Sequence, residues 1–321
     1  MESNGREKVI GISRVGNLLK KDEIRSSLYS LLDEMKKRNK ITIPPHGKVM
    51  IKPNICLVKC CESGTTVDPY VVQCLVDWLL ANYEIETIYI GEADATQLDI
   101  EIAFKVLGWE SIFNDYNQVK LLNLTTDDLF DVELENGLFF KNLEMSRAYM
   151  ESDFLISVAK LKTHTMTTIT GILKNQYGAN PVKYKLQYHP HLDEVICDLN
   201  MVRPPDLCLI DGLIAMEGEG PISGIPKPMG LLISGDDGLA TDHACARIMG
   251  FDPNNISHLK LALKQNVGSY NYNVFGESIE QVKTSFLLVP RWKKLITGVY
   301  NNEKIHKIPL WKSLVSKLFR G

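Results

Sequence analysis

Hydrophobic residues in the first 124 positions alternate between strand spacing and helix spacing. The expected strands are residues 8–13, 48–52, 87–90 and 119–122, and the expected helices are residues 23–38, 71–82 and 99–107. Strands that alternate with helices are typical of a parallel sheet covered on both faces. The pattern therefore predicts an α/β fold with an open, parallel-dominated sheet and helices on both faces.

The second half of the chain continues this pattern with two interruptions. The expected strands are residues 154–159, 207–210 and 229–233, and the expected helices are residues 193–201 and 239–249. Residues 130–143 alternate around Glu135-Asn136-Gly137, which predicts a peripheral β-hairpin. Residues 211–228 are rich in glycine and proline and are expected to form a long loop.

The length of 321 residues suggests about two domains. We expect an N-terminal α/β lobe at residues 1–150, a second α/β lobe at 151–285 and a basic tail at 286–321. With 45% hydrophobic and 23% charged residues, the composition is that of an ordinary soluble protein, and nothing in it indicates nucleic-acid binding. The chain shows neither a secretory signal nor a spanning segment, so we expect it in the cytoplasm.

The C-terminal tail is strongly basic. Residues 290–321 carry eight Lys or Arg residues and one Glu, a balance of +7. Within this tail, residues 310–319 have the pattern of a basic amphipathic helix, which favours peripheral contact with an anionic membrane. The alternative is a helix that docks on the acidic body of the protein.

The segment from Lys160 to Asn175 carries three lysines, one histidine and five threonines directly after the apolar run 154–159. We expect these donors to gather where a buried strand ends, which is where open α/β sheets bind ligands. Buried lysine and histidine side chains also need partners, and an anion or a metal would supply them. The alternative is a solvated basic loop.

These residue types suggest roles in binding a carboxylate or phosphate. Like charge from the lysines lowers the pKa of His164, which would leave it neutral as a general base. Lys162 and Lys174 would bind the anion or stabilise developing negative charge, with hydrogen bonds from Asn54, Thr65 and Thr66. Polar residues at the ends of neighbouring strands and in the central segment complete the predicted binding set: Lys52, Glu92, Thr170 and Asn175.

Metal ligands are expected in two places. Asp211, Glu217 and Glu219 could hold a hard cation, and the backbone at Gly218 and Gly220 could approach a phosphate or carboxylate. The alternative is an acidic surface turn. His189 and His191 are also candidate ligands, although only an extended loop would bring both to one metal, so a single ligand is favoured.

The seven cysteines are odd in number and irregularly spaced, which argues against a disulfide framework. Cys56, Cys60 and Cys61 follow an expected strand and could form a metal or redox site. Their spacing, however, matches neither a zinc knuckle nor a ferredoxin run.

Eight ordered segments between about residues 48 and 260 resemble the family called domain of unknown function 362. They are Ile51–Asn54, Gly64–Thr66, Gly91-Glu92, Lys160–His164, Thr170–Asn175, Asp211-Gly212, Met216–Pro221 and Gly250–Pro253. Many members of that family carry ferredoxin-type cysteine runs, which imply iron–sulfur clusters. This chain lacks those runs, so we expect no iron–sulfur cluster here.

The order His164, Lys174 and then His189 or His191 is also similar, more distantly, to the lactate racemase superfamily. That resemblance implies a catalytic histidine, a lysine that carries a nickel-pincer nucleotide and a metal-binding histidine. The glycine-rich segment around the lysine of those racemases is replaced here by residues 170–175.

We therefore expect an enzyme that acts on a small carboxylate or a sugar-linked anion by racemase- or epimerase-like chemistry. The alternatives are Mg²⁺-dependent phosphoryl or nucleotidyl transfer, a metal or iron–sulfur carrier, and an adaptor docked on a membrane complex through its basic tail. The chain has no P-loop to support phosphoryl transfer. The substrate and the cofactor, whether nickel-pincer nucleotide, Mg²⁺ or none, stay open.

Overall fold

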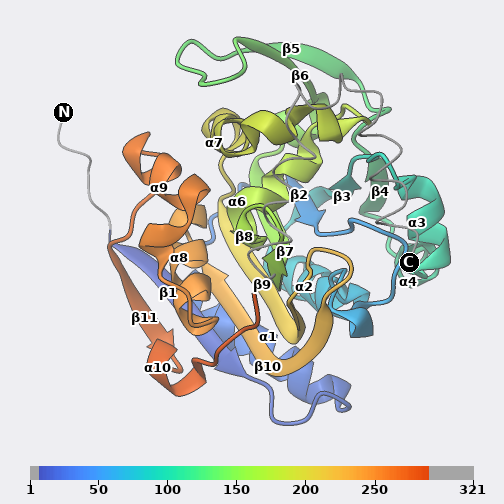
Figure 1. Ribbon diagram of the computed structural model, residues 1–321. Coiled ribbons are helices and arrows are strands. Elements are labelled where there is room, and N and C mark those ends of the chain that lie inside the picture. Colours follow the sequence, from blue (N-terminus) through green and yellow to red (C-terminus); the bar gives the residue numbers. More distant parts are fainter. Residues whose placement is uncertain (1–6, 289–321) are drawn as a thin grey trace.

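The computed structural model describes residues 7–288, which form a mixed sheet with helices on both faces (Figure 1). The strand order is β11-β1-β10-β9-β7-β2-β3-β4, with β8 paired to β7. These strands are β1 (Lys8–Arg14), β2 (Gly47–Pro53), β3 (Ile85–Glu92), β4 (Val119–Asn123), β7 (Phe154–His164), β8 (Thr168–Ile169), β9 (Leu207–Glu217), β10 (Ile225–Gly235) and β11 (Tyr272–Gly276). The predicted α/β class is confirmed.

The helices of residues 7–288 are α1 (Lys21–Lys37), α2 (Pro69–Asn82), α3 (Ile100–Val106), α4 (Trp109–Phe113), α5 (Arg147–Met150), α6 (Gly171–Gln176), α7 (Leu192–Val202), α8 (Gly238–Ile248), α9 (Ser257–Lys264) and α10 (Ile279–Val282). Helices α1, α2, α3, α7 and α8 correspond to the five predicted helices, and the other helices were not predicted. At the start of α2, the Asp68 side chain accepts a hydrogen bond from the backbone N–H of Tyr70, and Pro69 occupies the first turn. This is the helix start that the Asp-Pro pair predicts.

Most of the sheet is parallel. Strand β10 runs antiparallel to both of its neighbours, β1 and β9, whereas β9, β7, β2, β3 and β4 are parallel in succession. The carboxyl ends of β2, β3 and β7 therefore lie at one edge of the sheet, where ligands bind in folds of this type.

The central strands are buried on both faces, and each face has its own hydrophobic core. In β2, Met50 belongs to the core that includes α6, α7, α8 and α9, whereas Val49 and Ile51 belong to the core that includes α1, α2 and α3. Side chains that alternate between two covered faces explain why parallel strands are nearly continuous apolar runs. Figure 1 shows α6 and α8 on one side of the sheet and α1 and α2 on the other.

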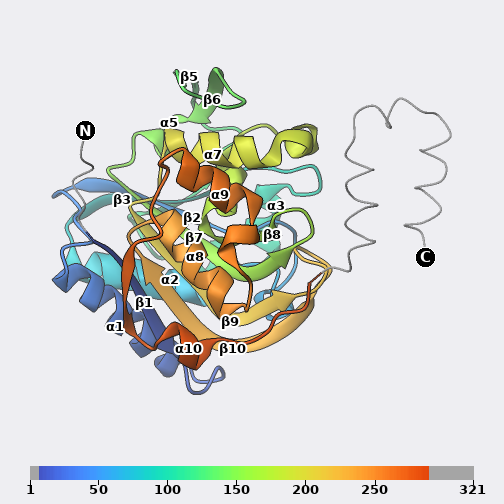
Figure 2. The same cartoon turned by 60° about the vertical axis from the view of Figure 1, so that its left-hand side comes forward.

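The predicted peripheral hairpin is confirmed. Strands β5 (Leu129–Glu133) and β6 (Asn142–Ser146) pair in antiparallel fashion, and this ribbon projects from the body near α5 and α7 (Figure 2). Asp198 of α7 holds the ribbon in place, because its carboxylate accepts hydrogen bonds from the backbone N–H groups of Leu138, Phe139 and Phe140.

The prediction of a long loop at residues 211–228 is wrong. Strands β9 and β10 both extend into it, and only the turn between Glu217 and Ile225 connects them. Two of the prolines, Pro226 and Pro228, lie in the part of β10 that extends beyond its paired residues with β1. Proline has no N–H to donate, so it is tolerated where a strand has one free edge.

The two predicted lobes contribute to one sheet, since β2 from the first pairs with β7 from the second. The predicted division into lobes stays a prediction. The basic tail lies outside the described residues from residue 289 onward. Its predicted helix at 310–319 and its predicted membrane contact therefore also lie outside them. Within residues 7–288, no helix combines the length and the apolar character needed to cross a bilayer.

Candidate functional site

A cavity of about 660 Å³ lies at the carboxyl ends of β2, β3 and β7. Its polar lining comes from these strand ends, from α6 and from the short 3₁₀ segment Lys185–His191. Strand β7 extends to His164, so the basic segment begins inside the strand and not after it. This correction follows from the pairing of β7 with β8 and β9, which continues beyond the apolar run.

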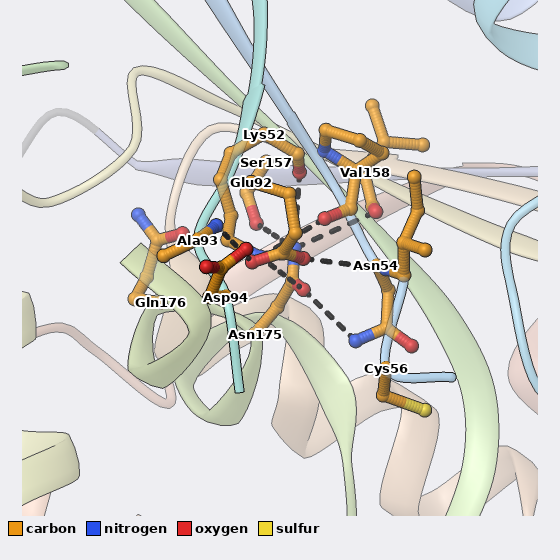
Figure 3. A network of polar contacts seen from close by, with 12 residues as sticks. Lys52, Asn54, Cys56, Glu92, Ala93, Asp94, Ser157, Val158, Asn175 and Gln176 are labelled. Carbon is orange, nitrogen blue, oxygen red and sulfur yellow. Dashed lines mark hydrogen bonds and ion pairs between the residues drawn. The ribbon is translucent and has the colours of Figure 1, made fainter. Parts of the chain in front are cut away.

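Lys52 and Glu92 form a buried ion pair in the lining of the cavity, and Figure 3 shows the polar network around it. The distance from Lys52 Nζ to Glu92 Oε2 is 2.6 Å, and the two side chains are 0% and 4% exposed. Lys52 Nζ also donates to the carbonyl of Pro53 and to Asn175 Oδ1. Burial lowers the pKa of Lys52, and the charge of Glu92 opposes that shift.

Asn175 of α6 ties the ends of β2 and β7 together. Its Nδ2 donates to the carbonyl of Lys52 at 3.1 Å and to Ser157 Oγ at 3.0 Å, and its Oδ1 accepts from Asn54 Nδ2 at 3.0 Å. These partners fix the orientation of both amides. Asn54 must turn its Nδ2 toward Asn175, which leaves its Oδ1 on the other side without a partner among the described residues (Figure 3).

The cavity has an excess of positive charge. Four lysines line it, Lys52, Lys162, Lys174 and Lys185, whereas Glu92 is the one carboxylate among the described residues of the lining. Burial lowers the pKa of Lys162, and it lowers that of Lys185 to about 8. Because Glu92 is already paired with Lys52, three lysines have no carboxylate in the lining to neutralise them.

Lys174 lies against an aromatic ring of the cavity lining. Its Nζ lies 4.0 Å from the centre of the Tyr177 ring, and no carboxylate among residues 7–288 forms an ion pair with it. Burial lowers its pKa to about 7, the thiolate form of Cys56 opposes this shift, and the charges of Lys162, Lys52 and Lys185 add to it. An amine with this pKa is substantially neutral at pH 7 and can accept a proton.

The hydrogen bonds of His164 determine its tautomer. Its Nδ1 accepts from the backbone N–H groups of Met166 at 3.2 Å and Thr167 at 3.3 Å, so the proton of the neutral ring resides on Nε2. Burial lowers the pKa of His164 well below its ordinary value, and the charge of Lys174 adds to the effect. The neutral ring therefore offers a hydrogen-bond donor, which differs from the acceptor nitrogen that a general base requires.

Asp211 lies outside the cavity lining, and its carboxylate is hydrogen-bonded within the fold. Its Oδ2 accepts from Lys160 Nζ at 2.7 Å and from the backbone N–H of Asp68 at 2.8 Å, and its Oδ1 accepts from the N–H of Leu213. Lys160 and Asp211 are 1% and 0% exposed. The pair joins β7 to β9 and anchors the start of α2, so this carboxylate is already fully used by the fold.

The predicted site residues fall into two groups, those that line the cavity and those that do not. Lys52, Asn54, Glu92, Lys162, His164, Thr170, Lys174, Asn175 and His189 line it. The residues outside the lining are Thr65, Thr66, His191, Asp211, Glu217, Gly218 and Gly220. Several of these support the fold near the site: the Thr65 carbonyl accepts from Lys162 Nζ, the Gly218 carbonyl accepts from Thr163 Oγ1, and Glu217 pairs with Lys227.

The predicted metal ligands are not brought together. His189 lines the cavity, His191 lies against the Phe139 ring, and Asp211 is paired with Lys160. Within residues 7–288, no three His, Cys, Asp or Glu side chains are placed to share a metal ion. The carboxylate set Asp211, Glu217 and Glu219 is therefore not assembled, because β9 carries Asp211 into the core and pairing with Lys227 occupies Glu217.

Lys185 and Gly178 were not predicted, although both contribute to the site. Lys185 reaches the backbone carbonyl of Asp94 from a segment more than 80 residues later in the chain. Gly178 packs so closely on the ion pair that a Cβ there would lie 2.5 Å from both Lys52 Nζ and Glu92 Oε1. Neither residue has a local pattern that indicates its role, since each depends on tertiary contacts.

The comparisons with known proteins give a family and one partial relative. The family model described as Domain of unknown function (DUF362) matches residues 49–247. A similar protein is the thylakoid-associated protein sll1697 of Synechocystis sp., which is 34% identical over 142 residues, covering 40% of this chain and 44% of that protein. The chain thus spans less than half of that relative's length. No solved structure matches the chain.

Proposed function

Since the chain belongs to the DUF362 family, whose description leaves the activity open, we propose a function from the cavity itself. The protein is an enzyme that binds a small carboxylate-bearing anion and transfers a proton at the carbon beside the carboxylate. The observation that carries this proposal is the excess of lysine over carboxylate in the lining. Buried cations without counter-charges favour an anionic ligand, because the ligand offsets the cost of their desolvation.

In this proposal Lys162 and Lys185 hold the carboxylate. A bound anion raises the pKa of both amines and so favours their charged forms. Asn54 and Thr170 belong to the same lining, and their unpartnered Oδ1 and Oγ1 atoms supply a hydrogen-bond acceptor and a hydroxyl for the rest of the ligand. A ligand that satisfies these atoms removes the free-energy cost of leaving them unpaired.

The acid–base chemistry is assigned to Lys174 and His164. The neutral amine of Lys174 takes the proton from the carbon beside the carboxylate. The Nε2–H group of His164 donates a hydrogen bond to the oxygen on which negative charge develops, as a preorganised donor does in other enolate-forming sites. Return of the proton to the same or the opposite face gives exchange or racemisation.

Hydrogen–deuterium exchange tests this function. The protein is incubated in D₂O with a panel of 2-hydroxy and 2-amino acids, each chiral acid as a single enantiomer, and the signal of the proton on the carbon beside the carboxylate is followed by NMR. We expect loss of that signal for at least one acid. Lys174→Met should abolish the exchange, and His164→Asn should slow it by about 10²- to 10³-fold.

Two controls make the result specific. Lys260→Met removes an exposed lysine of α9 and should leave the exchange rate unchanged. Lys162→Met should weaken binding of the acid, measured by calorimetry. Exchange that persists in the Lys174→Met variant, or a complete absence of exchange across the panel, would overturn the assigned chemistry. Absence of any binding would overturn the anion site as well.

A further inference from the structure

Cys56 lines the same cavity and is in contact with one of its lysines. The distance from Lys162 Nζ to Cys56 Sγ is 3.3 Å, and the Sγ lies 3.8 Å from the carbonyl oxygen of Thr65. Its side chain is half-buried and faces the cavity, unlike Cys60, which follows four residues later and is exposed. The two cysteines therefore form a natural comparison within one segment.

Several cations act on this sulfur. Burial lowers the pKa values of Lys52, Lys162 and Lys174, and negative charge on Cys56 opposes the shift at all three. Lys162 Nζ lies 3.3 Å from the sulfur, so its amine is placed to take up the thiol proton. Thiolates beside lysines are the nucleophilic form of cysteine.

Two residues of the same lining carry buried polar atoms without partners among the described residues. Asn54 precedes Cys56 by two residues, and its Oδ1 is buried without a partner among the described residues. Thr170 Oγ1 is likewise buried and unpartnered, and both residues line the cavity. A cavity that holds unpartnered polar atoms together with excess lysine is suited to a small polar anion.

We propose that Cys56 is a nucleophilic thiol of this cavity and forms a covalent bond with an electrophilic carbon of a small carboxylate held by the lysines. This inference rests on the anion binding proposed above and is independent of the proton transfer, and it adds a second class of ligand: carboxylates that carry an aldehyde or ketone carbon.

The step balances without a further reactant. The thiol proton moves to the Lys162 amine, whose charged form then holds the ligand's carboxylate, and the Cys56 sulfur adds to the carbonyl carbon. The electron pair of the C=O π bond moves to the oxygen, which takes the proton back from Lys162. One S–C bond and one O–H bond form, and the C=O π bond and the S–H bond break. No oxidant or reductant is required.

Charge-selective alkylation of the wild-type protein tests the proposal. Iodoacetate and iodoacetamide both transfer a carbon to sulfur with loss of iodide and of the thiol proton, and they differ in charge. The labelling rates of the peptides that contain Cys56 and Cys60 are measured by mass spectrometry for each reagent. We expect the ratio of iodoacetate rate to iodoacetamide rate to be at least about tenfold higher at Cys56 than at Cys60, because a lysine-lined cleft concentrates anions.

Variants and a competitor identify the cause. Lys162→Met should reduce that ratio at Cys56, whereas Lys260→Met should leave it unchanged. Pyruvate, which carries a ketone beside a carboxylate, should slow labelling of Cys56 more than acetate does. Equal ratios at the two cysteines, or equal protection by pyruvate and acetate, would overturn the proposal. If calorimetry detects acetate binding while Cys56 shows no charge selectivity, Cys56 is not the nucleophile, and the proposed anion site is still supported. If no acid binds, both the anion site and the role of Cys56 are rejected.

Discussion

Lys52 Nζ and Glu92 Oε2 lie 2.6 Å apart at a position where neither side chain reaches bulk solvent. All three hydrogens of the lysine have acceptors: Glu92, the carbonyl of Pro53 and Asn175 Oδ1. The carboxylate also accepts from the backbone N–H groups of Ile55 and Ala93. The pair is therefore fully satisfied within the fold, and the positive charge left for a ligand comes from Lys162, Lys174 and Lys185.

Removal of one partner of this pair should destabilise the protein strongly. Glu92→Gln leaves the Lys52 charge buried without its counter-charge, and we expect the free energy of unfolding to fall by about 3 kcal/mol. Urea unfolding at pH 7 measures this change. Glu151→Gln is the matched control, because it breaks the exposed pair with Arg147 and should leave the free energy of unfolding nearly unchanged.

A double variant separates charge from packing. Lys52→Met combined with Glu92→Gln removes the unpaired cation. The double variant should therefore lose less free energy of unfolding than the two single variants lose in sum. If the two losses simply add, the two side chains are not energetically coupled and the interpretation of the pair fails.

The sequence was sufficient to predict the elements that follow local periodicity. Helix α2 has an Asp-Pro start and an apolar stripe, and the ribbon of β5 and β6 has an Asn-Gly turn, so both could be identified from neighbouring residues. The convergence of Lys52, Glu92 and Lys162 on one cavity also followed, because parallel strands end at the same sheet edge.

Features set by tertiary pairing could not be predicted. The prolines of residues 211–228 indicate a loop in isolation, but pairing with β9 overrides that preference. Asp211 is of a residue type that often binds metal ions, but its carboxylate is paired with Lys160 on the adjacent strand. Similarly, the role of His164 depends on two backbone N–H groups whose positions are created by the turn after β7.

The depressed pKa of Lys174 should produce a specific dependence of stability on pH. The pKa of Lys174 is about 7 in the folded protein, whereas its ordinary value is 10.5. Between these two pH values the unfolded chain therefore binds more protons than the folded protein. The free energy of unfolding contributed by this group therefore rises as pH increases from about 7. We expect Lys174→Met to have a smaller increase in stability than the wild type between pH 7 and 8.5, measured by urea unfolding.

The same measurement on Lys260→Met provides the control, since this exposed lysine should leave the slope unchanged. Parallel slopes for the wild type and Lys174→Met would show that the amine of Lys174 titrates similarly in the folded and unfolded states. Its assignment as the proton acceptor would then lose its basis.

His164 should remain neutral in mildly acidic solution with its proton on Nε2. Protonation would place a hydrogen on Nδ1, where the N–H groups of Met166 and Thr167 already donate. We expect ¹⁵N NMR of the histidine rings to show the Nε2–H tautomer at pH 7 and no titration of this ring at pH 6, where an unperturbed histidine is largely protonated. His164→Asn assigns the signal by its loss. Half-protonation near pH 6.5 would contradict the tautomer.

The start of α6 should be intolerant of a side chain at Gly171. Its φ is +60°, and a Cβ there would lie 2.2 Å from Asp242 Oδ1, an oxygen that accepts from the N–H of Ile172 at 2.6 Å. Because α6 carries Lys174 and Asn175, this cap also sets the position of both side chains. Gly171→Ala should therefore combine backbone strain with loss of the Asp242 cap, and we expect about 2 to 3 kcal/mol less stability.

Gly108→Ala isolates the backbone contribution, because Gly108 has a φ of +78° and no atom within 4 Å of its Cβ position. That substitution should cost about 1 kcal/mol from the positive φ alone. The difference between the two variants, measured by urea unfolding, then reports the clash with Asp242. If the two costs are equal, Asp242 moves aside freely, and the carboxylate does not hold the helix that presents Lys174 to the cavity.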